Sequence, residues 1–202
     1  LAVTAYDRYG NVATNAITSV ALSLVGSVPG ATLSGTNAAS TVDGVATFSG
    51  LSVDRSGVGY TLVAASSGLL SDVSAGFDVL VGASARLAFV SAPASAVAGD
   101  AFEVVVAAMD AAGNVVPDAT GTVSLSLGGT LLATAPLASG IATFPNVVVE
   151  TAHPAALLQA ASGPLAAMAQ PIVVEPAQPS AMEFLWAPIT PTAGGAIEPA
   201  VR

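Results

Sequence analysis

The segment VTAYDRYGNVATNAITSVALSL, residues 3–24, recurs as VAAMDAAGNVVPDATGTVSLSL at residues 106–127. Both copies contain the pattern D..GN, in which Asp7 matches Asp110 and Asn11 matches Asn114. Both copies end in a run, SVALSL and TVSLSL, in which every second residue is apolar. A period of two is typical of a β-strand that packs one face inward. Self-similarity on this scale predicts a tandem array in which each repeat is one structural unit.

Two further matches set the frame of the array. The phrase GVATFSGLSVD at 44–54 matches GIATFPNVVVE at 140–150, and residues 85–104 match residues 180–199. We therefore expect repeat one at 1–84, repeat two at 85–179, and the first strand and start of the second strand of a further repeat at 180–202. Repeat one lacks the opening strand that residues 85–94 supply in repeat two.

The strand pattern predicts an all-β fold of tandem immunoglobulin-like β-sandwiches. About seven short strands in about 95 residues, separated by turn signals such as Asp43-Gly44, suit two antiparallel sheets packed face to face. No segment has the apolar period of a helix. The alternation predicts a core for repeat two made of Phe89, Phe102, Val104, Val123, Leu125, Phe144, Val148 and Leu158.

The composition excludes several classes of protein. The net charge is −9, which repels phosphate backbones, so we expect no nucleic-acid partner. There is no Cys, hence no disulfide or thiolate metal site, and no Lys, hence no Lys–Asn isopeptide crosslink. No uninterrupted apolar run is long enough to span a membrane, and Leu1 opens directly on a strand, so any export signal is expected outside these residues.

The order of the phrases resembles a known family. LAFV…P…AG…F.V.V…D..GN is followed by SVALSL and then by GVATFSGLSVD…GYTLVAASSG. This order is similar to that of the bacterial immunoglobulin-like (Big) repeats of large surface and adhesin-like proteins, of the invasin and intimin kind, over essentially the full chain. The resemblance implies an extracellular stalk or fibre and supplies no catalytic residues.

Asp7, Asp110 and Asp118 are the candidate metal ligands. A calcium site draws six to eight oxygen ligands together; Asp7 and Asp110 recur in the turns of both repeats, and Asp118, eight residues after Asp110, matches Asn15. The alternative is that Asp and Asn close a turn by accepting bonds from their own backbone, with Gly in the left-handed conformation. We favour turn chemistry, and we expect no cofactor and no requirement for metal.

Four other residues carry side chains that could serve a site. His153, the only His, is expected in an exposed turn, without the Ser and carboxylate of a catalytic triad. Tyr60 is placed like the tyrosine corner of a sandwich. Phe184 and Trp186 are interface candidates, and for Trp186 packing between domains or subunits is favoured over core packing and glycan binding. No enzyme activity is expected.

The sequence leaves two functions open. The first is a structural segment of an extracellular stalk or filament. The second is an adhesin-type module that recognises a glycan or a host protein, and fold alone does not decide between them. Partners would be neighbouring repeats or copies of the chain. The frame of residues 1–84 and 180–202 fits either a window of a longer array or strand addition between copies into a fibre. Abundant Ser and Thr without an N-glycosylation sequon allow O-linked glycans.

Overall fold

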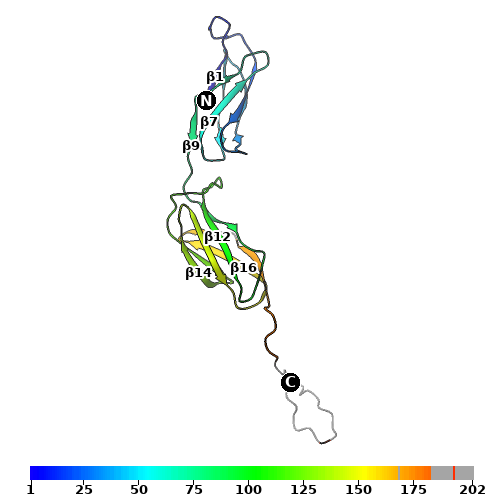
Figure 1. Ribbon diagram of the computed structural model, residues 1–202. Coiled ribbons are helices and arrows are strands. Elements are labelled where there is room, and N and C mark those ends of the chain that lie inside the picture. Colours follow the sequence, from blue (N-terminus) through cyan, green and yellow to red (C-terminus); the bar gives the residue numbers. More distant parts are fainter. Residues whose placement is uncertain (168, 183–192, 194–202) are drawn as a thin grey trace.

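The computed structural model describes residues 1–167, 169–182 and 193, and these residues form strands and turns without a helix (Figure 1). The predicted all-β class is therefore confirmed. No helix among these residues is long and apolar enough to cross a membrane. The strands of the first part are β1 (Ala2–Thr4), β2 (Ser19–Val25), β3 (Leu33–Ser34), β4 (Ala38–Ser40), β5 (Val45–Thr47), β6 (Ser52–Val53), β7 (Gly57–Ala65), β8 (Asp72–Val73) and β9 (Phe77–Val79). Those of the second part are β10 (Arg86–Ser91), β11 (Ser95–Val97), β12 (Ala101–Met109), β13 (Thr122–Leu127), β14 (Thr130–Pro136), β15 (Ile141–Val148), β16 (His153–Ser162), β17 (Leu165–Ala166) and β18 (Gln170–Glu175).

Repeat two is a sandwich of two sheets. One sheet has the order β10-β12-β15, and the other has the order β11-β18-β16-β13-β14, with β17 paired to β16. The chain changes sheet between β10 and β11, because β10 pairs antiparallel with β12 whereas β11 runs parallel to β18. Alternate residues of both sheets meet in one core, as sheets packed face to face require. That core includes Leu87, Val104, Val106, Val123, Leu125, Leu127, Phe144, Leu158, Ile172 and Val174.

The core prediction is right except at Val148. Five of the eight residues are fully buried, and Phe89 and Phe102 pack half-buried against them. Val148 is 43% exposed, and Val147 is buried in its place at 2%. The cause is a β-bulge: Phe102 pairs with Val147 but Val104 pairs with Phe144, so β15 has one extra residue opposite Glu103. A bulge inverts the alternation beyond it, because the extra residue moves each later side chain to the other face.

Repeat one has the same number of strands, but they are divided among three sheets, β1-β5, β3-β6 and a larger one. Its larger sheet has the order β4-β2-β7-β8, and the pairing of Val3 with Ala46 in β1 and β5 matches the pairing of Val106 with Ala142 in β12 and β15. Its core centres on Val20, Leu22, Ala46 and Phe48. Whereas β12 pairs on both sides, β1 pairs on one side only within the described residues.

Candidate functional site

The D..GN motif forms a closed turn in repeat two. The main-chain N–H of Asn114 donates to Asp110 Oδ1 at 2.8 Å, and Asn114 Nδ2 donates to Asp110 Oδ2 at 3.0 Å. The main chain adds bonds from Asp110 N to Asn114 O and from Gly113 N to Asp110 O, at 2.9 and 3.2 Å. Gly113 takes a φ of 93°, which an L side chain rarely adopts. This is the turn that the Asx interpretation of the motif expects.

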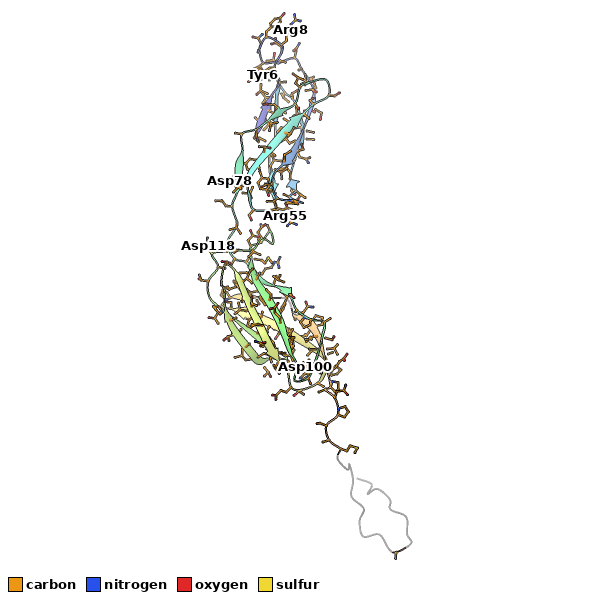
Figure 2. All side chains as sticks on the ribbon, viewed as in Figure 1. Tyr6, Arg8, Arg55, Asp78, Asp100 and Asp118 are labelled. Carbon is orange, nitrogen blue, oxygen red and sulfur yellow. The ribbon has the colours of Figure 1, made fainter. Side chains whose placement is uncertain are left out.

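Repeat one contains the same turn at the end that lies away from repeat two, beside Tyr6 and Arg8 in Figure 2. Asn11 N donates to Asp7 Oδ1 at 2.9 Å, Asn11 Nδ2 donates to Asp7 Oδ2 at 3.0 Å, and Gly10 has a φ of 86°. An additional bond from Tyr9 N to Asp7 Oδ1, at 2.8 Å, follows the usual Asx pattern. The two turns differ in their surroundings, because Asp110 is 4% exposed whereas Asp7 is exposed.

Asp110 is buried and Asn114 half-buried because their turn joins the two repeats. Gly82, in the connection between them, donates its main-chain N–H to Asp110 Oδ2 at 3.0 Å. Asn114 contacts the loop of repeat one that follows β6: its Oδ1 accepts from Ser56 N and its Nδ2 donates to Asp54 O, both at 3.2 Å. Figure 2 shows Arg55 and Asp118 on the two sides of this junction. We call the turn, the loop 54–56 and Gly82 the junction clasp.

Repeat one holds its half of the junction clasp in shape with separate bonds. The Asp54 carboxylate accepts from Thr32 N at 2.7 Å and from Thr32 Oγ1 at 2.9 Å. The Tyr60 hydroxyl donates to Arg55 O at 3.1 Å, which is the tyrosine corner expected from the sequence. Tyr60 is fully buried beside Phe77. Bonds within repeat one therefore hold Asp54 O and Ser56 N in place independently of repeat two.

These hydrogen bonds stabilise the ionised carboxylates. Bonds from the Asn114 side chain, the Asn114 main chain and Gly82 N lower the pKa of Asp110 to about 2. The corresponding bonds from Asn11 lower the pKa of Asp7, and those from Thr32 lower the pKa of Asp54. The clasp is thus a set of charge-assisted and main-chain hydrogen bonds.

The candidate calcium ligands do not gather in one place. Asp7 and Asp110 lie in turns of different repeats, and Asp118 is exposed in the loop before β13. In the part of the chain that the structure describes, no three His, Cys, Asp or Glu side chains are grouped as metal ligands would be. That metal is dispensable stays a prediction.

The remaining candidates do not assemble a catalytic site in the described residues. His153 is half-buried as the first residue of β16, not exposed in a turn as expected, because it pairs with Val174 of β18. Phe184 and Trp186 lie outside the described residues. Two shallow surface depressions are present, one against β15 near Phe144 and one at the lower end of repeat two near Glu150 and His153.

Sequence reasoning missed the partners of the D..GN turn. Asp54, Ser56 and Gly82 contribute mainly main-chain atoms to the clasp, so their residue types carried little signal. It also missed an aromatic pair beside the Asp7 turn, where Tyr6 is 59% and Tyr9 72% exposed. The signal for that pair was present in the phrase AYDRYGN.

No protein-family model matches the chain, and no curated protein matches its sequence. Among solved structures, the fibronectin(III)-like modules of Clostridium thermocellum CbhA are similar at 14% identity and a TM-score of 0.32, with 83% of each chain covered.

Proposed function

We propose that this chain is a structural repeat segment of an extracellular stalk or filament, which holds a surface assembly together or spaces a distal tip from the cell. The junction clasp is the observation that carries this proposal. It fixes the upper end of repeat two in Figure 1, which carries the Asp110 turn, to the lower end of repeat one, which carries the loop 54–56. A spacer needs joints that resist bending. An array of such units gains stability from each repeat and from each interface.

The surface chemistry supports the same proposal. Many outward positions of the strands carry Ala, Ser or Thr, as in β2, where Ser19, Ala21 and Ser23 are exposed between inward-facing Val20, Leu22 and Leu24. Small uncharged side chains permit close lateral contact and O-linked glycosylation. The likeness of the repeat phrases to bacterial immunoglobulin-like repeats of the invasin and intimin kind agrees with an extracellular role.

Surface labelling of intact cells tests this location. Antibodies raised against repeat two should label unpermeabilised cells that produce the protein, and external protease should remove the signal. A cytosolic marker protein serves as the control for intact membranes. Label that appears only after permeabilisation would rule the proposal out.

Strand addition between copies is a second way to lengthen such a fibre. Residues 180–202 match residues 85–107, and β10 pairs Phe89 with Val106 of β12. A donated segment in that register would place Phe184 opposite Val3 of β1, the strand that has one partner among the residues that the structure describes. Since the chain has no Cys, Val3→Cys and Phe184→Cys in separate copies should crosslink under mild oxidation. The control pairs Val3→Cys with Leu185→Cys, which is shifted by one residue and should not crosslink. Absence of a crosslink between Val3→Cys and Phe184→Cys would exclude strand addition.

The exposed aromatic pair favours one alternative, an adhesin-type module for a glycan or a host protein. Tyr6, Tyr9 and Val12 are exposed around the Asp7 turn, at the end of the molecule that carries Tyr6 and Arg8 in Figure 2. However, the Arg8 guanidinium lies over the Tyr9 ring, 4.6 Å from its centroid, so that face of the ring is already covered. Binding to immobilised glycans or host matrix proteins that is lost in Tyr6→Ala would support this alternative over a purely structural role.

A further inference from the structure

Within the junction clasp, the Asp110 turn binds main-chain atoms of repeat one and of the linker. Asn114 binds Ser56 N and Asp54 O, and Asp110 binds Gly82 N. The turn therefore places no demand on the side chains of the loop above it. Any immunoglobulin-like repeat that offers one loop C=O, one loop N–H and one linker N–H in this arrangement can occupy it.

The linker position also tolerates a side chain. A Cβ placed on Gly82 would lie 3.4 Å from the nearest atoms of Asp110, which is ordinary contact. Ala177 occupies the corresponding position after repeat two. The clasp thus depends on backbone geometry rather than on glycine at this point.

The Asp7 turn is built like the Asp110 turn but lacks these contacts. Its internal bonds between Asn11 and Asp7 repeat those between Asn114 and Asp110 to within about 0.1 Å. Within residues 1–167 and 169–182, nothing donates to Asn11 Oδ1, and Asp7 Oδ2 accepts only from Asn11. The same atoms of the Asp110 turn accept from Ser56 and Gly82.

The apolar side chains beside the two turns follow the same contrast. Tyr6 and Val12 are exposed at 59% and 43%, whereas their counterparts Met109 and Val115 are half-buried. Polar and apolar groups that are covered in repeat two are uncovered at the same positions of repeat one.

We propose that the Asp7–Asn11 turn is a docking site for the lower end of another immunoglobulin-like repeat joined ahead of it in the same chain. Asn11 takes the C=O and N–H of that repeat's loop, and Asp7 Oδ2 takes the linker N–H. This inference rests on the proposed end-to-end array and names the partner of its exposed end. A repeat in the same chain is the occupant because a clasp of three hydrogen bonds is too weak to hold a separate molecule, whereas a short linker supplies a millimolar effective concentration.

A duplicated chain tests the proposal. Leu1 aligns with Val104, so residues 1–103 followed by residues 1–202 continue the repeat frame without a break and place a second loop 54–56 above an inner Asp7 turn. Amide hydrogen exchange at Ser56 and Gly82 reports the clasp at each junction. We expect the new junction to protect both amides as the existing junction does.

Asn11→Ala in the inner copy should raise exchange of the Gly82 amide at the new junction about ten-fold, because Gly82 keeps its acceptor Asp7 Oδ2 while the junction loses two hydrogen bonds that water partly replaces. The same substitution in the outer copy, whose turn has no repeat above it, is the matched control and should change nothing there. Unprotected Ser56 and Gly82 amides at the new junction would overturn the proposal, as would equal effects of the inner and outer substitutions.

Two further results separate the alternatives. Self-association of the 202-residue chain in sedimentation experiments, abolished by Asn11→Ala, would replace the same-chain partner by a second copy and so overturn the assignment. Failure of surface labelling would remove the stalk proposal while leaving exchange at the new junction unaffected, so the two failures are distinguishable.

Discussion

Replacing Asn114 with Ala should loosen the joint between the repeats without unfolding either one. The substitution removes the side-chain bonds to Ser56 N and Asp54 O and the local bond to Asp110 Oδ2. Asn11→Ala is the matched control, because it removes the equivalent local bond to Asp7 Oδ2 and no bond between repeats. The difference between the two variants therefore isolates two hydrogen bonds across the junction.

The expected magnitude follows from those two bonds. Each is worth about 0.5–1.5 kcal/mol net, and the lower part of that range applies because Asp54 is exposed and Ser56 half-buried, so water replaces the lost partner. The free energy of closing the junction should fall by about 1–1.4 kcal/mol. The open population should then rise about five- to ten-fold.

Two measurements detect the opening. Amide exchange at Gly82, which keeps its acceptor Asp110 Oδ2, should accelerate in Asn114→Ala by the same five- to ten-fold factor and stay unchanged in Asn11→Ala. Because the chain has no Cys, spin labels at Ala21→Cys and Thr143→Cys, both exposed strand positions, report the distance between repeats alone. The distance distribution should broaden only in Asn114→Ala. Equal exchange rates and equal distributions in the two variants would refute the clasp.

Three other perturbations test the core, the turn and the metal. Phe144→Ala should lower the free energy of unfolding of repeat two by about 3–5 kcal/mol, whereas Val148→Ala should change it by about 0.5 kcal/mol or less. Denaturant titration measures both values. Similar losses in the two variants would contradict the bulge. The hydrogen bonds to Asp110 lower its pKa from 3.8 to about 2, so its stabilising contribution is complete above about pH 4 and disappears as the pH falls toward 2. Asp110→Asn should flatten this part of the profile of unfolding free energy against pH. An unchanged profile would contradict the lowered pKa. Chelator should leave the melting temperature unchanged, and a drop reversed by calcium would identify a metal site that includes Asp7 or Asp110.

The class of fold could be predicted from local pattern. Inward-facing residues such as Val123 and Leu125 alternate strictly with polar neighbours, and that period determines which face of a strand is buried whatever the partner strand is. The D..GN turn was equally local, because Asp110 and Asn114 close it with their own main chain. The tyrosine corner of Tyr60 also follows from a short segment.

The burial of Val147 in place of Val148 was decided by tertiary structure. The alternation holds through Phe144 and is reversed at Pro145 and Asn146, where the pairing with β12 admits an extra residue. Nothing in the run ATFPNVVV states where the partner strand requires that residue. The register between two strands is a property of their pairing and not of either sequence alone.

The sequence by itself determined the all-β class, the repeat, and a turn with two carboxylate oxygens and an amide at its surface. Only the tertiary structure decided what that turn binds. Asp54, Ser56 and Gly82 are far from Asn114 and Asp110 in the chain, and they reach the turn because the loop after β6 and the connection after β9 lie at the same end of the sandwich. Since they are recognised through main-chain atoms, which every residue carries, no pattern of residue types could have marked them.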